Sequence, residues 1–305
     1  MLYESQTFRL EADDQVLTLW LDFRGRPSHA FTLPVLNELS LVLDRIAALP
    51  PADVILVRSS RPDTFLEEFD AAELAGFNSP LEFAAMARRG QAVTRKLRQL
   101  ATPTIALIEG RCAGAGLELA LACTSRLAVD SARTRFDFAE LDRGLIPAWG
   151  GTYLLPRLVG AGAAARLLRD GGSFGAIAAE RIGVVDRVVP ASRLAVELLS
   201  VLDEVRERGA VRPPVARRVW RSARAFFGAG LGSRAPETGT PAAELMGAMA
   251  AGRSSEGEGL AAERAALSRL AATDSTRNLL AMHRQAAHPG REFAEPTSPD
   301  RGVPR

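Results

Sequence analysis

The sequence predicts an α/β fold, because segments with the pattern of strands alternate with longer segments that have the pattern of helices. The first strand-like segment, residues 15–23 (QVLTLWLDF), alternates apolar and polar residues at period two. Residues 33–49 place leucine, valine and isoleucine at helical spacing and end at Pro50-Pro51, which cannot continue a helix. A short apolar run at 53–57 (DVILV) follows, so the order is strand, helix, strand.

The same alternation continues to about residue 190. Residues 82–100 have the pattern of a long amphipathic helix that ends at Thr102-Pro103. The later predicted elements are a buried strand at 104–108, an apolar helix from about Gly116, a strand at 126–129, a helix over 150–170 and a last strand at 187–190.

The sequence divides into three parts. Residues 1–190 are predicted to form the α/β core, and residues 191–288 a helical region in which no further strand is predicted. A flexible loop is expected near 228–258, which is rich in Gly, Ser, Pro and Ala. Residues 289–305 are polar, contain four prolines and are expected to be a disordered tail. The helices expected in the second part are 191–208, 214–227 and 259–287.

The composition excludes several classes of protein. The 38 basic and 36 acidic residues leave a formal net charge of +2, so the total does not predict a surface for nucleic acid. Cys112 and Cys123 lie in an apolar stretch without metal-ligand spacing, so no metal site is predicted and a reducing compartment is expected. The sequence has neither a signal-peptide pattern nor an apolar stretch long enough to span a bilayer. We therefore expect a cytoplasmic protein that does not bind a membrane.

The first candidate for chemistry is the segment Gly114-Ala115-Gly116-Leu117-Glu118. Small residues between a strand and a helix allow another group to approach the backbone, and the first N–H groups of the helix point outward unpaired. This is the arrangement of an anion or oxyanion site, although tight packing alone also explains small residues at such a place. Glu118 strengthens the functional interpretation, because a carboxylate in an apolar helix has a raised pKa that suits proton transfer.

The second candidate is Glu140, which precedes a turn punctuated by glycine and proline over residues 144–152. Thr152 is predicted to cap the next helix. A surface position is the alternative interpretation of Glu140 alone. Two glutamates on neighbouring elements, each beside glycines, can however act as general base and general acid on one substrate.

These motifs, in this order, resemble the crotonase superfamily, the enoyl-CoA hydratases and isomerases. The resemblance covers about the first two thirds of the chain, including IALIEGRCAGAGLELALAC and FAELDRGLIPAWGG. Residues 259–283 are similar to the linker helix of multifunctional fatty-acid oxidation α-subunits. No GxGxxG motif after a strand follows, so NAD binding is not expected.

The resemblance implies a spiral of ββα units with a C-terminal helical region, and an acyl-CoA thioester as the substrate. Glu118 and Glu140 match the family's catalytic glutamates. The backbone N–H groups of Phe69 and Ala115 match its oxyanion hole. No cofactor is implied, because coenzyme A is part of the substrate, and a homo-oligomer, a trimer or hexamer, is expected. The substrate-binding residues that the resemblance adds are Leu66, Asp70, Gly114 and Gly116.

The sequence also departs from the family's pattern. Glu67 and Glu68 stand where small residues are usual and add negative charge near a ligand that carries phosphates. His29, in the place of an asparagine, is expected to be a surface residue rather than a ligand. Hydration of a 2-enoyl-CoA is the leading hypothesis, with a Δ3,Δ2-enoyl-CoA isomerase or a catalytically silent assembly subunit as alternatives.

Overall fold

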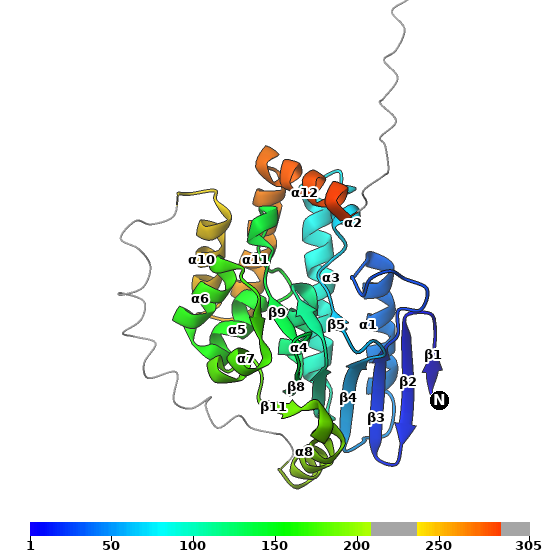
Figure 1. Ribbon diagram of the computed structural model, residues 1–305. Coiled ribbons are helices and arrows are strands. Elements are labelled where there is room, and N and C mark those ends of the chain that lie inside the picture. Colours follow the sequence, from blue (N-terminus) through cyan, green and yellow to red (C-terminus); the bar gives the residue numbers. More distant parts are fainter. Residues whose placement is uncertain (209–236, 288–305) are drawn as a thin grey trace, which may run out of the picture.

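The computed structural model describes residues 1–208 and 237–287, and it confirms the α/β prediction with two β-sheets surrounded by helices (Figure 1). The larger sheet has seven strands in the order β1 (Tyr3–Glu4), β2 (Phe8–Asp13), β3 (Val16–Leu21), β4 (Val54–Ser59), β6 (Thr104–Ile108), β8 (Ser125–Asp130) and β11 (Arg187–Pro190). The smaller sheet has four strands in the order β10 (Phe174–Gly175), β9 (Arg135–Asp137), β7 (Arg111–Ala113) and β5 (Thr64–Leu66).

Eleven α-helices lie in the described part of the chain. They are α1 (Leu33–Ala47), α2 (Ala71–Ala75), α3 (Pro80–Gln99), α4 (Ala115–Ala122), α5 (Gly151–Val159), α6 (Ala161–Asp170), α7 (Ala176–Ile182), α8 (Leu194–Arg208), α10 (Pro241–Ala251), α11 (Glu256–Ala271) and α12 (Asp274–Ala287). Two short 3-10 helices, η1 (Leu141–Arg143) and η2 (Ala191–Arg193), join them.

The core repeats one unit, two strands followed by helix. The pair β4 and β5 precedes α2 and α3, the pair β6 and β7 precedes α4, and the pair β8 and β9 precedes η1 and α5. In each pair the first strand joins the seven-stranded sheet and the second joins the four-stranded sheet. The spiral of ββα units that the resemblance implied is therefore present.

The central strands are covered on both faces, which explains why they are continuously apolar. β6 is buried at every position, as expected of a parallel strand between two layers. Along β4, Val54 and Leu56 pack with residues of α8, whereas Ile55 and Val57 belong to the main core on the other face. The period-two alternation thus assigns neighbouring residues to opposite layers.

Two predicted helices and one predicted loop differ from the structure. The single helix expected over 150–170 is two helices, since Gly160 has a φ of +84° that breaks the helical path. The flexible loop expected near 228–258 is helical over 241–251, where Pro241 begins α10 and alanines favour the helix. The helix expected over 259–287 is broken near Thr273 into α11 and α12. The expected helix 214–227 and tail 289–305 lie outside the described residues.

The C-terminal helices fold back onto the core. α11 packs along α3 and α10, and α12 packs on α2 and η1. Figure 1 shows α11 beside α3, with α12 at one end of the molecule. These contacts bring residues beyond 255 to the segments that follow the short strands, where the predicted site residues lie.

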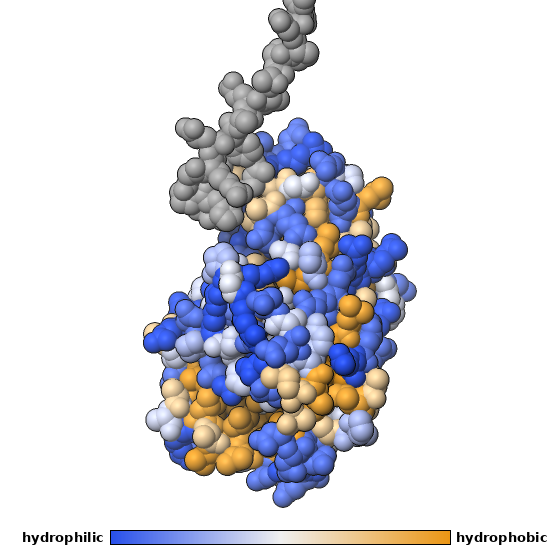
Figure 2. Space-filling model, turned by 90° about the vertical axis from the view of Figure 1, so that its right-hand side faces the viewer, coloured by the Kyte–Doolittle hydropathy of each residue, from blue (hydrophilic) through white to orange (hydrophobic). Residues whose placement is uncertain are grey.

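The surface seen from the side of β1, β2 and β3 is mostly hydrophilic, with a hydrophobic area near the end opposite α12 (Figure 2). Within the described ranges, none of the helices has the length and the apolar run needed to cross a membrane.

Two buried polar groups belong to the fold. Asp186 binds Arg126 through one oxygen, at 2.7 Å from both the Arg126 backbone nitrogen and Nη2, and both side chains are 2% exposed. His29 is fully buried and stacks on Phe23, which corrects the expected surface position. Burial lowers the pKa of His29 to about 4, so it packs as a neutral ring.

Candidate active site

Three short parallel strands end at one edge of the smaller sheet. β5 pairs with β7 and β7 pairs with β9, all in parallel. The carboxyl ends of parallel strands meet at the same edge, so the segments that follow them come together. Those segments are 67–70 after β5, 114–118 after β7 and 138–144 after β9. The sheet therefore gathers the residues that the sequence singled out one by one.

Glu118 lies in the first turn of α4 and is 1% exposed. Its Oε1 accepts hydrogen bonds from the backbone nitrogens of Trp149, at 2.8 Å, and Gly151, at 2.6 Å, where α5 begins. A Cβ at Gly151 would lie 2.8 Å from the same oxygen, so glycine is needed for this approach. Burial is the largest cause that raises the pKa of Glu118, followed by the charges of Glu263 and Glu140, and the two N–H donors oppose it.

Trp149 fixes the loop that supplies one of these donors. Its ring packs against Gly90 of α3, where a Cβ would lie 2.3 Å from the indole, and its Nε1 lies 3.2 Å from the sulfur of Met86. The rings of Phe31 and Phe69 meet it edge-on, with centroids at 4.7 and 6.3 Å. A side chain held on so many sides keeps the backbone N–H of Trp149 aimed at Glu118.

Glu140 begins the tight turn η1, which the left-handed residue Gly144 ends at a φ of +73°. The residue is partly exposed, but its Oε2 is buried and has no hydrogen-bond partner among the described residues. Its Oε1 lies 2.7 Å from the place of a Cβ at Gly114. Burial raises the pKa of Glu140 to about 8, against its own backbone N–H and Arg143, which lower it.

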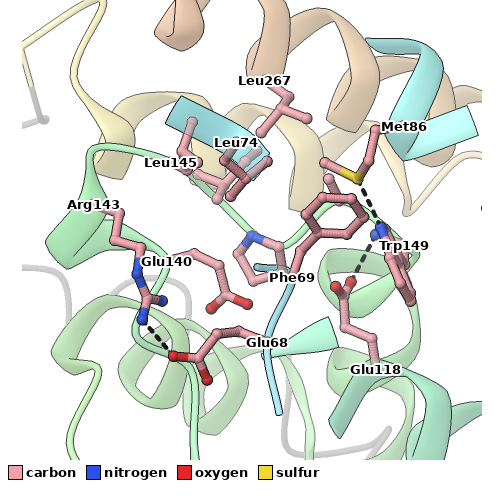
Figure 3. A pocket seen from close by; sticks show the side chains of 13 residues that line it. Glu68, Phe69, Leu74, Met86, Glu118, Glu140, Arg143, Leu145, Trp149 and Leu267 are labelled. Carbon is pink, nitrogen blue, oxygen red and sulfur yellow. Dashed lines mark hydrogen bonds and ion pairs between the residues drawn. The ribbon is translucent and has the colours of Figure 1, made fainter. Parts of the chain in front are cut away.

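Both glutamates line one cavity of about 40 Å³ (Figure 3). A cavity of this size holds a water molecule, and an unpartnered carboxylate oxygen is a suitable acceptor for it. Apolar side chains form most of the wall. The lining residues are Glu68, Phe69, Leu74, Met86, Glu118, Glu140, Arg143, Leu145, Ile146, Pro147, Ala148, Trp149 and Leu267.

Glu67 and Glu68, expected to add negative charge, lie among cations. Glu68 binds Arg143 and lies 3.3 Å from Arg111, which also lies 3.7 Å from Glu67 and 3.3 Å from Asp137. Burial raises the pKa of Glu68, but the two guanidinium groups outweigh it and hold that pKa below its ordinary value. The negative charge of Glu68 is thus paired with two guanidinium groups of the protein, and its side chain also lines the cavity.

The backbone N–H groups of Phe69 and Ala115 lie at the ends of two neighbouring strands. Phe69 forms an isolated parallel β-bridge with Phe31. The donors in that bridge are the backbone nitrogens of Phe31 and Asp70, so the nitrogen of Phe69 takes no part in it. Ala115 is the first residue of α4, whose N–H has no partner within the helix. Across residues 1–208 and 237–287, the backbone hydrogen bonds between elements include neither N–H as a donor. Neither N–H therefore has a backbone acceptor in this part of the chain, and their role as an oxyanion hole stays a prediction.

The other predicted substrate-binding residues support the backbone of the site. Asp70 caps α2 by accepting from the nitrogen of Glu73 at 2.9 Å. Gly116 lets Leu66 approach, since a Cβ there would lie 2.5 Å from the Leu66 carbonyl oxygen. Gly114, at a φ of +49°, makes the same kind of room for Glu140. None of these residues is in the cavity lining, so their contact with a substrate stays a prediction.

Sequence reasoning missed Glu263 of α11. It is fully buried and binds Thr152. Thr152 was predicted to cap α5, but the N-cap residue of that helix is Gly150. A signal existed, because Glu263 falls on the apolar face that Leu260, Leu267 and Leu270 define. Its partners lie more than 100 positions earlier in the chain, so the sequence could not identify them.

The residues that the structure describes contain no group of three or more His, Cys, Asp and Glu side chains arranged for a metal ion. Cys112 and Cys123 are both buried and free. The carboxyl groups on the cavity are able to transfer protons.

Comparison with known proteins agrees with this arrangement. The family model for enoyl-CoA hydratase/isomerase matches residues 14–216. The fatty acid oxidation complex subunit alpha of Vibrio vulnificus (strain CMCP6) is 32% identical over 232 residues, which are 76% of this chain and 32% of that protein. That of Vibrio parahaemolyticus is 31% identical over 207 residues, 68% of this chain and 29% of that protein. The chain thus spans a third or less of the length of these relatives.

Solved structures show the same fold. The enoyl-CoA hydratase of Bacillus anthracis is 27% identical, with a TM-score of 0.60, and the match covers 72% of this chain and 90% of that one. The enoyl-CoA hydratase of Bacillus halodurans, at 20% identity, supports the fold alone, with a TM-score of 0.69 over 90% of this chain and 99% of that one. The family match over most of the chain and the shared spiral of ββα units establish that the chain belongs to the enoyl-CoA hydratase/isomerase family of the crotonase superfamily.

Proposed function

We propose that the protein is an enoyl-CoA hydratase that adds water across the 2,3 double bond of an acyl-CoA thioester. The observation that carries the proposal is the placement of Glu118 and Glu140 on one water-sized cavity with apolar walls. Hydration needs a group that removes a proton from water and a group that delivers one to carbon, and two glutamates on one cavity can share these roles.

The reaction follows from these groups. One carboxylate removes a proton from a water molecule while the oxygen of that water forms a bond to C3 of the substrate. The electron pair of the double bond moves toward the thioester carbonyl. The enolate oxygen that results is stabilised by the N–H groups of Phe69 and Ala115. The protonated partner glutamate then gives its proton to C2, which restores the thioester carbonyl. One water is consumed, and no cofactor is needed because coenzyme A is part of the substrate.

The raised pKa values of the two glutamates suit this exchange. A carboxyl group near neutral pKa gives and accepts a proton readily at neutral pH, whereas an ordinary one is a weak base. Burial raises the pKa of both glutamates, that of Glu140 to about 8, so each keeps a proton to higher pH than an ordinary carboxyl group does.

A second cavity supports an acyl chain as part of the substrate. It has a volume of about 160 Å³, lies between α2, the start of α3, the end of α11 and the middle of α12, and shares Leu74 with the catalytic cavity. Its lining is mixed, with the apolar side chains Phe77, Phe83 and Leu280 beside the polar residues Asn78, Ser79 and Arg277. We infer that this space takes the end of the acyl chain and that Leu74 stands between the tail and the reacting carbons.

The test is the loss of conjugated enoyl-thioester absorbance when crotonyl-CoA is added to the protein. We expect turnover by the natural chain, and a decrease of about 10²–10⁴-fold in kcat for Glu118→Gln and for Glu140→Gln. The control variant is Glu258→Gln, which makes the same change at an exposed position of α11, outside the lining of the catalytic cavity. Full activity in either cavity variant would remove that glutamate from the mechanism.

The same assay separates the two alternatives. Absorbance that increases when a 3-enoyl-CoA is supplied, without loss from crotonyl-CoA, would replace the hydratase by the isomerase. The silent subunit predicts no change in absorbance and no binding of acetyl-CoA in a calorimetric titration.

A further inference from the structure

A second buried carboxylate reaches the amino end of α5, beside Glu118. Glu263 extends from α11, and its Oε1 accepts from the Thr152 nitrogen at 3.0 Å and the Thr152 hydroxyl at 2.6 Å. Its Oε2 accepts from the Gly150 nitrogen and from Nε2 of Gln91, both at 3.0 Å. All four donors come from groups that are themselves buried.

The two carboxylates divide one set of donors between them. The N–H groups of Trp149 and Gly151 point to Glu118, and those of Gly150 and Thr152 point to Glu263. Four consecutive N–H groups at the start of a helix thus hold two side chains that come from α4 and α11. Loss of either carboxylate leaves two buried N–H groups without a partner and changes the position of the other pair.

The unequal number of donors decides which carboxylate is ionised. Glu263 receives four hydrogen bonds spread over both oxygens, whereas the two bonds to Glu118 fall on a single oxygen. Hydrogen bonds to a carboxylate favour its charged form, and two adjacent buried negative charges oppose each other. The arrangement therefore places the charge on Glu263 and leaves the proton on Glu118.

We propose that Glu263 is a positioning residue for the reaction: it fixes the amino end of α5 against Glu118, and its charge keeps a proton on Glu118. The proposal rests on the proposed function, in which Glu118 takes part in proton transfer. Glu263 itself is absent from the cavity lining, so it acts through Glu118 and not on the substrate.

The charged groups around Glu263 agree with this role. Glu118 faces it from α4, and Arg264 is next to it on α11, where its guanidinium donates to Oε1 of Gln91. Arg88 and Arg95 of α3 act on Arg264. Burial raises the pKa of Glu263 to about 7, although the hydrogen bonds from Thr152, Gln91 and Gly150 lower it. Glu263 therefore ionises near neutral pH.

The first measurement is the pH dependence of kcat/KM for the full chain and for Glu263→Gln. Removal of the negative charge lowers the proton affinity of Glu118, so we expect the profile to move to lower pH by about one unit. Glu263→Asp keeps the charge and is expected to keep the wild-type midpoint, even where the rate falls. The matched control is Glu258→Gln, which makes the same change at an exposed position of α11.

A purely structural role predicts a different result. Glu263→Gln would then lower the melting temperature and the rate at every pH, with an unchanged profile, and that outcome would overturn the proposal. Should Glu263→Gln not fold, Thr152→Val removes one donor to Glu263 and keeps the shape of the side chain. This variant weakens the ionised form of Glu263, so we expect a smaller shift in the same direction, with Thr152→Ser retaining the wild-type midpoint.

A second measurement needs no substrate. Unfolding free energies of Glu118→Gln, Glu263→Gln and the double variant form a mutant cycle, measured near pH 6 and near pH 9. Coupling between the two glutamates predicts an interaction energy that differs between the two pH values, because Glu263 gains its negative charge beside Glu118 as the pH rises. Additive effects at both pH values would contradict the inference. Coupling without enoyl-CoA turnover would instead contradict the proposed function alone.

Discussion

Replacement of Glu140 by glutamine is expected to stabilise the fold at alkaline pH while it lowers the activity. The pKa of Glu140 is raised from 4.5 to about 8, chiefly by burial. Between these values the folded chain binds more protons than the unfolded chain, so the stability of the natural protein falls as the pH rises. The slope is about 1.4 kcal/mol per pH unit.

The full effect follows from the size of the shift. Above about pH 8 the ionised Glu140 costs about 3–5 kcal/mol, the lower value allowing for the partial exposure of the residue. Glutamine carries no charge, and its amide can occupy the same place beside Gly114. The advantage of Glu140→Gln over the natural chain is therefore small near pH 5 and increases steadily up to about pH 8.

Urea unfolding at several pH values measures this difference directly. Glu207→Gln is the control, because it makes the same change at an exposed position of α8. A difference between Glu140→Gln and the natural protein that is the same at every pH would refute the reasoning, since it would mean that Glu140 ionises in the folded state as it does in the unfolded one.

Three further substitutions test the packing around Trp149, a buried ion pair of the fold and the wall between the two cavities. Gly90→Ala places a Cβ 2.3 Å from the Trp149 ring and should cost about 1–3 kcal/mol in urea unfolding; an effect below about 0.5 kcal/mol would mean that the ring moves freely. Asp186→Asn breaks a buried ion pair and should lower the free energy of unfolding by about 3–5 kcal/mol. The double variant Arg126→Met/Asp186→Leu should recover most of that stability, and a double variant that stays as unstable would mean that the loss comes from packing. Leu74→Ala joins the two cavities and should raise kcat/KM for long acyl chains relative to crotonyl-CoA, whereas an unchanged ratio would place the acyl chain elsewhere.

Much of the core was predictable because its elements are long and their patterns regular. The strand at 53–57 and the helix over 82–100 appear in the structure as β4 and α3 with bounds that differ by one or two residues. Hydrophobic periodicity is reliable where a segment lies between two layers.

The strands β5, β7 and β9 were not predicted, since each is only three residues long and shows no periodicity. They nevertheless hold the site together, because their parallel pairing brings Glu118 and Glu140 to one edge. The sequence singled out Glu118, in an apolar helix beside glycines, and Glu140, before a turn punctuated by glycine and proline. It did not identify the pairing that puts them on the same cavity.

Two errors have a common cause. The segment 241–251 was assigned to a loop on composition, although alanine and a proline at the first position are also typical of a helix. Glu263 was passed over because its partners, Gly150 and Thr152, are more than 100 positions away. In both places tertiary contacts with the core decide the outcome, and a single sequence does not contain them.

The most direct test of the proposed hydration is the fate of solvent atoms. Crotonyl-CoA is incubated with the protein in water enriched in oxygen-18, and separately in deuterium oxide, and the product is analysed by mass spectrometry. The two-glutamate mechanism predicts a 3-hydroxyacyl-CoA that holds one solvent oxygen at C3 and one solvent hydrogen at C2. Solvent hydrogen in the thioester without solvent oxygen would contradict it, because Glu118 and Glu140 would then move protons without adding water.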